Sequence, residues 1–488
     1  MKALALLLGC LVAGSAVADL PPEIARLLAA LKIPQDDVSI VVQAVDAPLP
    51  ILSHLADTPR SPASVMKIVT TWSALEYLGP AYTWPTEVYF LGAFDGRRLD
   101  GDLALKGYGD PYLVVEELWK LLRTLRRQGL TEVGRNLVLD DSFFAVDEPD
   151  PGQFDGQPYR TYNVVPNALL MNFKAAQLQF APDSEHGRVQ VAADPVLPNL
   201  TIRNNLQLVD GPCHGFQAGI EFNHADPLTL AEVELNGKFS RRCNPIGLGR
   251  TVLQHDTYAF GLFTELWQEV GGVFRGELRK AEIPADQTPV LTWRSRPFGE
   301  IIRSINKNSN NVMTRQLLYT LGAESAGPPG TRANGVTAIR SLLAGRGLDI
   351  SSLLLSNGAG LSRDERASMR LLTDVLRLAY QSPFAPEFLA SLSLGGLDGT
   401  TRGRFDGREG DSLMHVKTGR LDHVSALAGY VHTPARTYTV AIVMNSEDAH
   451  RGPGQELEEA VVRWTQAQKV APPSVTAINP PNAPIAAQ

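Results

Sequence analysis

The chain has 488 residues, of which 44% are hydrophobic and 20% charged, a composition typical of globular proteins and unlike that of a disordered chain. Its 45 basic and 52 acidic residues give a formal net charge of −7, which disfavours non-specific binding to nucleic acid or to an anionic membrane. At roughly 150 residues per domain, the length allows about three domains. Only 11 of the basic residues are lysines, so chance rarely produces a motif that requires lysine.

The first residues have the features of a secretion signal. Lys2 precedes the apolar run 3–14, and the Ala-Val-Ala sequence at 16–18 is the small-x-small pattern that signal peptidase cleaves. We therefore expect a signal peptide at 1–18 and a protein secreted to the periplasm. A transmembrane anchor is one alternative, but the run is shorter than the ~20 residues that span a bilayer. Lipidation at Cys10 is another, because a lipoprotein-like box ends there.

Removal of that signal leaves two cysteines, Cys213 and Cys243, in a compartment that permits disulfides. A bridge between them closes a loop of about 30 residues, worth roughly 3 kcal/mol in the chain-entropy model. A metal site with His214 and His224 is the alternative, although no paired-cysteine or HExxH spacing supports it. We favour the disulfide and expect no metal site.

The mature chain begins with a strand and a helix. Residues 38–45 are rich in β-branched side chains and predict a buried strand. Ser61 is expected to cap the following helix, with Pro62 in its first turn and Gly79 and Pro80 as its stop.

From about 85 to 290 the pattern changes to short β-like runs between turn clusters, at 86–91, 103–106, 136–139 and 188–192. One helix, at about 113–128, interrupts them, so this region predicts one or two mainly β modules. Helical periodicity returns at 298–305, 312–321, 335–346 and 368–380. Strand-like runs follow at 413–417, 424–431 and 438–444, then a helix at 455–468 and a proline-rich tail expected to be disordered.

Ser64 and Lys67 form an S-x-x-K pattern in the first turn of the helix expected after Ser61. An oxyanion at Ser64 would lie near the positive end of the helix dipole and its unpaired N–H groups. Lys67, one turn further, could accept the hydroxyl proton if burial or a nearby cation keeps it neutral. A capping serine and a surface lysine are the alternative.

Two further patterns occur later in the chain. Lys417, Thr418 and Gly419 end a strand-like run, and a glycine there lets another backbone or a ligand approach closely. The alternative is that this glycine opens a turn. Ser309 and Asn311 form an S-x-N pattern between two helical segments, where a helix N-cap is an equal explanation.

The three patterns occur in the order found in the serine penicillin-recognising enzymes. The sequence resembles one group of that superfamily, the class C low-molecular-weight penicillin-binding proteins, which are D-alanyl-D-alanine carboxypeptidase/endopeptidases. Members of this group carry domains inserted at the point where, in this chain, Lys67 and Ser309 are 242 positions apart. The stretches 101–103 with 109–111, 305–307 and 357–363 also look like family signatures, and the resemblance covers nearly the whole mature chain.

The resemblance implies an α/β (α+β) fold with a transpeptidase-like domain, in which helices flank an antiparallel sheet. That domain would be split into 19–85 and 290–470, with two nested β-rich modules inserted at 86–289 and a disordered tail at 471–488. The first strand would join the last three, which brings Ser64 and Lys417 together.

Carried over residue by residue, the resemblance makes Ser64 the acylated nucleophile and Lys67 its general base. Ser309 would relay the proton to the leaving amine. The backbone N–H groups of Ser64 and Arg420 would form the oxyanion hole. The substrate-binding residues would be Asn311, which holds the amide, together with Lys417, Thr418, Gly419, Arg420 and Arg363.

One position departs from the family pattern, because Arg420 stands where Ser or Thr usually follows K-T-G. A backbone donor tolerates this change, but the hydroxyl contact to the substrate carboxylate is lost. Arg420 could instead bind that carboxylate through two parallel hydrogen bonds.

The implied activity is hydrolysis of peptidoglycan peptides that end in D-Ala-D-Ala, without a cofactor, with covalent inhibition by β-lactam antibiotics. A β-lactamase is a second enzyme hypothesis, and a non-catalytic binder of peptidoglycan or penicillin is a third. A binder has no need of both lysines, so the complete motif set favours an enzyme.

Overall fold

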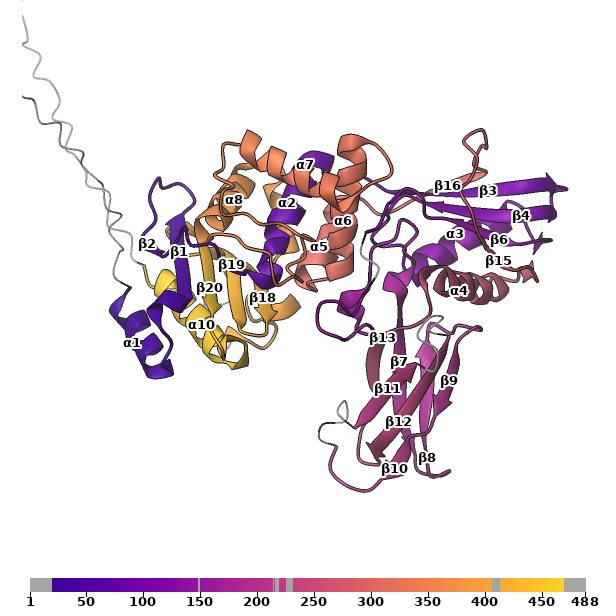
Figure 1. Ribbon diagram of the computed structural model, residues 1–488, viewed down its shortest axis with the longest axis horizontal. Helices are drawn as coiled ribbons and strands as arrows, with labels where there is room; N and C mark the ends of the chain where they lie inside the picture. The colour runs from indigo at the N-terminus through magenta and orange to yellow at the C-terminus, as the bar shows by residue number, and fades with distance from the viewer. Residues whose placement is uncertain are drawn as a thin grey trace, which may run out of the picture.

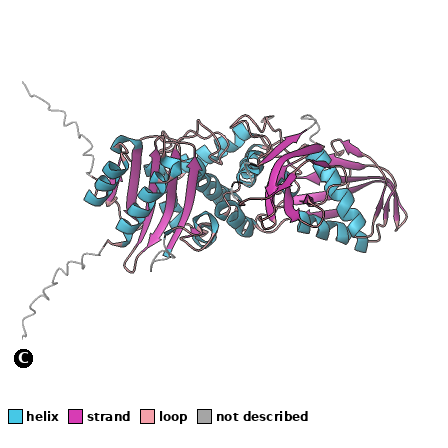
Figure 2. Ribbon diagram, turned by 90° about the horizontal axis from the view of Figure 1, so that it is seen from below, coloured by secondary structure: helices cyan, strands magenta, loops and turns pink. Residues whose placement is uncertain are grey.

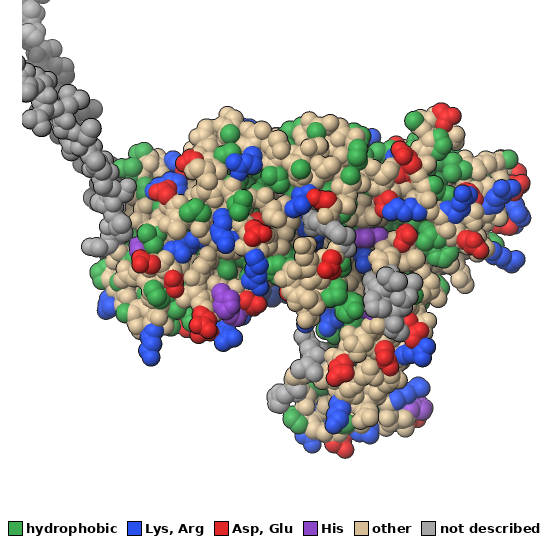
Figure 3. Space-filling model, viewed as in Figure 1, with side chains coloured by type: hydrophobic (Ala, Val, Ile, Leu, Met, Phe, Trp, Pro, Cys, Tyr) green, Lys and Arg blue, Asp and Glu red, His purple; other side chains and the backbone are tan. Residues whose placement is uncertain are grey.

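The computed structural model describes residues 20–147, 150–213, 215, 219–224, 231–405 and 413–468. One lobe of the molecule holds a six-stranded sheet between helices, and the other holds three further sheets (Figure 1). The signal peptide expected at 1–18 and the tail expected at 471–488 lie outside the described residues. Basic and acidic side chains are interspersed over the face shown in Figure 3, in keeping with the small net charge of −7.

The six-stranded sheet is antiparallel, in the order β17-β18-β19-β20-β1-β2. Strand β1 pairs along its whole length with β20, and Val38 lies opposite Met444. The prediction that the first strand joins the last three is therefore confirmed. The strands are β1 Val38–Ala44, β2 Leu52–His54, β17 Ser393–Leu394, β18 Met414–Leu421, β19 Val424–His432 and β20 Thr437–Asn445.

Helices cover both faces of this sheet (Figure 2), which confirms the predicted class of fold. Successive residues of β1 point to opposite faces. Val41 therefore packs in a core with α2 and α5 to α9, whereas Ile40 packs in a second core with α1 and α10. The helices are α1 Pro22–Leu31, α2 Lys67–Leu78, α5 Phe298–Lys307, α6 Asn311–Ala326, α7 Arg332–Gly345, α8 Met369–Gln381, α9 Ala385–Ser391 and α10 Pro453–Gln466. Within the described ranges, none of the helices is both long and apolar enough to cross a membrane.

The segment before α2 differs from the prediction. The backbone N–H of Ser61 donates to Asn445 Oδ1 at 3.0 Å, and its carbonyl accepts from Asn445 Nδ2 at 3.1 Å, so Ser61 is tied to the end of β20 and caps no helix here. Ala63 has a φ of +46°, which a right-handed helix cannot accommodate. A 3-10 turn, Ala63–Met66, therefore precedes α2, and the predicted N-cap is wrong.

The largest sheet of the second lobe has seven strands, and two helices share its core, α3 Val115–Arg127 and α4 His255–Glu269. The expectation of one helix in this region is wrong. Helix α4 contains Gly261, whose Cα lies so close to Asn199 that a Cβ would be 2.1 Å from Oδ1, and this glycine lowers the local helix propensity. The strands are β3 Pro85–Phe94, β4 Arg98–Gly107, β5 Glu132–Val133, β6 Leu137–Asp140, β14 Val273–Phe274, β15 Leu278–Lys280 and β16 Leu291–Arg294.

Two smaller sheets complete the second lobe and share its core. Cys213 and Cys243 form the predicted disulfide, with their Cα atoms 5.0 Å apart, which leaves neither thiol for the alternative metal site. The limits of the inserted modules at 86 and 289 stay a prediction. The strands are β7 Ala175–Asp183, β8 Arg188–Asp194 and β13 Ile246–Thr251 in one sheet, and β9 Thr201–Asn204, β10 Gln207–Val209, β11 Ile220–His224 and β12 Glu232–Ser240 in the other.

Candidate active site

Ser64 lies in the 3-10 turn and Lys67 is the first residue of α2, so the two side chains point the same way one turn apart. Lys67 Nζ lies 3.1 Å from Ser64 Oγ. The first nine residues of α2 are all buried, and Lys67 itself is fully inaccessible to solvent. The alternative of a surface lysine is therefore wrong.

Lys67 Nζ also donates to two groups that can only accept, Asn311 Oδ1 at 2.6 Å and the carbonyl of Ala359. Burial lowers the pKa of Lys67 well below its usual value, and the nearby positive charge of Lys417 lowers it further. The negative charge of Glu365 acts in the opposite direction. The environment as a whole favours the neutral amine.

Lys417, on β18, faces the S-x-N pattern. Its Nζ donates to Ser309 Oγ at 2.9 Å and to the carbonyl of Thr418 at 2.8 Å. Burial lowers the pKa of Lys417 to about 7. Two lysines with lowered pKa values thus each contact a serine hydroxyl, Lys67 at Ser64 and Lys417 at Ser309.

The N-cap of α6 is the middle residue of the S-x-N pattern. Asn310 Oδ1 accepts a hydrogen bond of 3.1 Å from the N–H of Met313. Ser309, just before it, has a φ of +53°, a strained conformation that turns its hydroxyl toward Lys417. Asn311, just after it, faces Lys67. Helix capping therefore accounts for Asn310 and leaves the side chains of Ser309 and Asn311 for the site.

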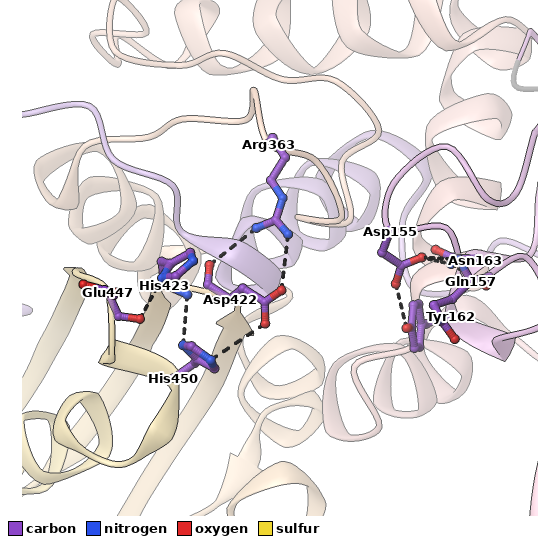
Figure 4. Close-up of polar contacts among 9 residues, drawn as sticks. All are labelled: Asp155, Gln157, Tyr162, Asn163, Arg363, Asp422, His423, Glu447 and His450. Atoms are coloured by element: carbon purple, nitrogen blue, oxygen red, sulfur yellow. Dashed lines mark hydrogen bonds and ion pairs between the residues drawn. The ribbon is translucent and has the colours of Figure 1, made fainter. Parts of the chain in front are cut away.

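Helix α6 is hydrogen-bonded to the second lobe along one face, which we call the α6 seam. Asn311 Nδ2 donates to the carbonyl of Tyr162 at 3.2 Å. The Tyr162 hydroxyl in turn donates to Asp155 at 2.7 Å (Figure 4). Four further bonds belong to the seam. They are Arg315 to the Val164 carbonyl at 2.8 Å, Gln316 Nε2 to the Asn167 carbonyl at 2.9 Å, the Asn167 N–H to Gln316 Oε1 at 3.0 Å, and Tyr319 to Asp147 at 2.7 Å. A residue of the second lobe therefore fixes the orientation of the Asn311 amide.

Two glycines allow three backbone segments to meet at Ser64. A Cβ on Gly419 would lie 2.5 Å from the Pro62 carbonyl and 3.1 Å from the Ser64 nitrogen. A Cβ on Gly360 would lie 1.9 Å from the Ala63 carbonyl, and Gly360 has a φ of +78°. The close approach predicted for the glycine of K-T-G is therefore confirmed, and it is made by backbone.

A cavity of about 260 Å³ opens beside Ser64. Ser309, Thr418, Gly419 and Arg420 line it together with Ser64. Five other lining residues were not predicted, namely Thr400, Arg404, Ser425, Gln455 and Glu458. Thr400 accepts a hydrogen bond of 2.7 Å from Thr418, and Arg404 forms an ion pair of 2.7 Å with Glu458. The structure thus brings eight of the predicted residues into one site, namely Ser64, Lys67, Ser309, Asn311, Lys417, Thr418, Gly419 and Arg420.

Arg363 lies apart from this cavity. Its guanidinium lies 4.9 Å from the ring centroid of Phe154. The guanidinium also pairs with Asp422 at 3.6 Å (Figure 4). Asp422 also faces His450 at 3.8 Å. Arg363 lines a separate cavity of about 640 Å³, and its binding to substrate stays a prediction.

Glu365 was missed in the sequence. Its buried carboxylate accepts four backbone N–H bonds, from Ser356, Asn357 and Gly358 on Oε1 and from Gly360 on Oε2, at 2.7 to 3.0 Å. These bonds hold the loop that presents the Ala359 carbonyl to Lys67. The only signal in the sequence was its position two residues after the stretch 357–363, and nothing there indicated that the carboxylate is buried.

Comparison with known proteins agrees with this geometry. The family model "D-Ala-D-Ala carboxypeptidase 3 (S13)" matches residues 20–468. The chain is 29% identical to a D-alanyl-D-alanine carboxypeptidase of Actinomadura sp. (strain R39) over 412 residues, 80% of this chain and 74% of that protein. It is 23% identical to D-alanyl-D-alanine carboxypeptidase DacB of Haemophilus influenzae over 418 residues, 84% of this chain and 86% of that protein.

A solved structure is similar in fold. Penicillin binding protein 4 (dacB) from Haemophilus influenzae superposes with a TM-score of 0.75 and 21% identity, and the match covers 91% of this chain and 99% of that one. A predatory peptidoglycan endopeptidase from Bdellovibrio bacteriovorus matches with a TM-score of 0.51 and 16% identity, over 88% of this chain and 90% of that one.

Proposed function

The chain belongs to the D-Ala-D-Ala carboxypeptidase 3 (S13) family and is a serine D-Ala-D-Ala carboxypeptidase, and we propose that Ser64 is its nucleophile and Lys67 its general base. One observation carries this proposal: Lys67 Nζ contacts Ser64 Oγ and two groups that can only accept. A neutral amine has two hydrogens and one lone pair. The hydrogens satisfy Asn311 Oδ1 and the Ala359 carbonyl, and the lone pair is left for the Ser64 hydroxyl.

Acylation then follows from the positions of these groups. Ser64 Oγ attacks the carbonyl carbon of the penultimate D-Ala while its proton passes to Lys67 Nζ. The backbone N–H groups of Ser64 and Arg420 stabilise the oxyanion, and such a donor is typically worth about 3 kcal/mol in the transition state.

The second proton transfer uses Ser309. As the C–N bond to the terminal D-Ala breaks, the Ser309 hydroxyl relays the proton that Lys67 took from Ser64 to the departing amine. Lys417, 2.9 Å from Ser309 Oγ, orients that hydroxyl. Lys417, Thr418 and Arg420 bind the carboxylate of the terminal D-Ala, while Asn311 binds the substrate amide. Water then hydrolyses the ester at Ser64 and releases the shortened peptide.

We also assign to this site the cleavage of D-Ala cross-links between peptidoglycan strands, and covalent inhibition by β-lactams. The penicillin binding protein 4 of Haemophilus influenzae has been solved in complex with a β-lactam, which supports the second assignment. The Cys213–Cys243 disulfide is typical of proteins in oxidising compartments and supports a periplasmic location.

Intact-protein mass spectrometry after incubation with benzylpenicillin tests the nucleophile. We expect one penicilloyl adduct on the wild type, none on Ser64→Ala, and one on Ser61→Ala, a neighbouring serine whose side chain is outside the site. An adduct on folded Ser64→Ala would overturn the assignment. A persistent adduct on the wild type favours the peptidase, and rapid turnover of penicillin favours the β-lactamase alternative. Release of D-Ala from a D-Ala-D-Ala peptide distinguishes an enzyme from a binder that is merely acylated.

A further inference from the structure

A second polar cavity lies in the other lobe, and the proposed function makes no use of it. It has a volume of about 590 Å³, within the range typical of small-molecule sites. We call it the Lys174 cavity, after the lysine in its wall. Its apolar lining comes from Phe144, Val146, Pro151, Pro158, Val165, Pro166 and Ala168, and its polar lining from Asp141, Asp150, Tyr159, Asn167, Lys174, Gln254, His255 and Lys280.

Lys174 is the unusual member of this set. Only 7% of it is exposed, and its Nζ makes no hydrogen bond or ion pair with any residue in the described part of the chain. The rest of the side chain is buried, and its Nζ keeps only the exposure that the cavity provides. An ammonium with so little hydration and no ion-pair partner is unfavourable, so proteins rarely contain one without a reason. Lys280, in the same wall, differs in being paired with Asp141 at 2.7 Å.

The backbone holds Lys174 in this position under strain. Asn172, Phe173 and Lys174 form a turn in which all three have positive φ, +45°, +55° and +50°. Side chains other than glycine adopt this conformation at a cost, and such strain concentrates at functional positions. The turn places Phe173 against the core that contains Val312 of α6, while Lys174 lines the cavity.

Helix α4 adds a second electrostatic feature. His255, its first residue, lines the cavity, so the positive end of a 15-residue helix dipole lies there. His255 hydrogen-bonds with the backbone of Val165, while its buried Nε2 has no hydrogen-bond partner among the described residues. Lys174 and the start of α4 both contribute positive potential, and the carboxylate of Asp256 in the first turn of α4, which accepts from the Thr257 N–H at 2.8 Å, opposes it.

The charges in the wall limit the ligand to one negative charge. Asp141 is satisfied by Lys280 and by Asn167 Nδ2, each at 2.7 Å. Asp150 is exposed, and its Oδ1 accepts from the N–H of Gly152 at 2.7 Å. Lys174 is the lysine of the wall that has no ion-pair partner among the described residues, and about half of the lining residues beside it are apolar. Asp150, and Asp256 on α4, are the nearby negative charges that a bound carboxylate must avoid.

We infer that the Lys174 cavity binds a small molecule that carries one carboxylate beside an apolar body. The carboxylate accepts from Lys174 Nζ and lies at the start of α4. The apolar body packs on the ring of Phe144 and the proline side chains. This site is independent of the proposed reaction at Ser64.

The pH dependence follows from the titratable groups around Lys174. Burial lowers the pKa of Lys174 to about 8, and the charge of Asp256 on α4 partly offsets that effect. Burial lowers the pKa of His224 to about 4 and that of His255 to about 3, so both are neutral at pH 7. Asp141, Asp150 and Lys280 also face the cavity. A carboxylate should bind to protonated Lys174, so its affinity should fall as the pH rises above about 8, the pKa of Lys174 in the unliganded protein.

The probe is N-acetyl-L-leucine, an apolar monocarboxylate that is not a D-Ala peptide, titrated into the full chain by calorimetry at pH 7. We expect N-acetyl-L-leucinamide to give no binding, and sulfate, with two charges, to bind more weakly. Lys174→Met should weaken the binding of the carboxylate by about tenfold or more, through loss of a charge-assisted hydrogen bond. Lys238→Met, at an exposed lysine on β12, should leave it unchanged.

Lys417→Met separates this site from the catalytic one, where a carboxylate could also bind. We expect Lys417→Met to retain binding of N-acetyl-L-leucine. If Lys417→Met abolishes the binding and Lys174→Met does not, the carboxylate occupies the catalytic site and the inference is wrong. No binding to the wild type, or equal binding of the acid and the amide, would also overturn it. If Lys174→Met fails to fold, the binding of N-acetyl-L-leucine to the wild type and to Lys417→Met is measured at rising pH instead. Binding that does not weaken as the pH rises would then overturn the inference.

Discussion

The carboxylate of Glu365 accepts a hydrogen bond of 2.8 Å from the backbone N–H of Gly360, the residue next to the carbonyl that Lys67 contacts. Glu365 thus acts on Lys67 in two ways, by fixing the position of that carbonyl and by its negative charge. The first effect is geometric and the second is electrostatic. The substitution Glu365→Gln changes both, and unfolding measurements and the pH dependence of acylation report on them separately.

Glu365→Gln should slow acylation by penicillin about tenfold or more and reduce the free energy of unfolding by about 2 kcal/mol, because an amide cannot accept all four N–H bonds of a charged carboxylate. The negative charge of Glu365 raises the pKa of Lys67, so its removal should move the acid limb of the acylation profile to lower pH. Stopped-flow acylation across pH and urea unfolding measure the two effects. Glu300→Gln, on the exposed side of α5, is the control, and an unshifted acid limb in Glu365→Gln would contradict the electrostatic effect.

Lys417→Met should move the acid limb of the acylation profile to higher pH. The charge of Lys417 lowers the pKa of Lys67, so its loss raises that pKa, and neutral Lys67 becomes available only at higher pH. Because burial gives Lys417 itself a pKa of about 7, the two profiles should differ most below pH 7, where wild-type Lys417 is charged. Acylation rates of both proteins across pH test this. Coincident acid limbs would show that Lys417 does not control the protonation of Lys67.

Gly360→Ala should abolish acylation and lower the stability of the fold. The new Cβ would lie 1.9 Å from the Ala63 carbonyl, next to the nucleophile, at a φ of +78° that alanine adopts only with strain. Gly345→Ala is the matched control, since a Cβ there meets nothing within 4 Å at the end of α7, and it should be neutral or slightly stabilising. Thermal unfolding and penicillin labelling compare them. Normal labelling of Gly360→Ala would refute the backbone contact as described.

Arg420→Ser restores the residue that usually follows K-T-G in the family. If the Arg420 guanidinium binds the substrate carboxylate, KM for a D-Ala-D-Ala peptide should rise several-fold, while the oxyanion contribution of the backbone N–H stays. Steady-state release of D-Ala measures KM and kcat separately. An unchanged KM counts against a role of the guanidinium in carboxylate binding.

Much of the site could be predicted from the sequence, because its chemistry is carried by short patterns whose residues lie close together. Ser64 with Lys67, and Lys417 with Gly419, belong to patterns set by helix and strand spacing. The pairing of β1 with β20 brings the two patterns together, and it was expected from the resemblance to the penicillin-recognising enzymes.

What the sequence did not reveal depends on contacts between distant segments. The pattern around Ser61 is a good N-cap signal, yet Asn445 of β20 engages that backbone instead, and Ala63 interrupts the helix. Glu365 and Glu458 look like surface acids in the sequence, and only the fold buries them. Thr400 meets Thr418 through tertiary packing that no local periodicity reports.

The α6 seam has a consequence for any attempt to shorten this protein. Excision of the insertion predicted at 86–289 would remove the backbone acceptors of the Asn311, Arg315 and Gln316 side chains, and Asn311 is the partner of Lys67. The second lobe thus contributes to the active site of the first lobe. Its Tyr162 carbonyl holds Asn311, and Asn311 in turn accepts from Lys67, the proposed base. A minimal catalytic unit would have to keep the stretch 147–167 or replace each of its acceptors.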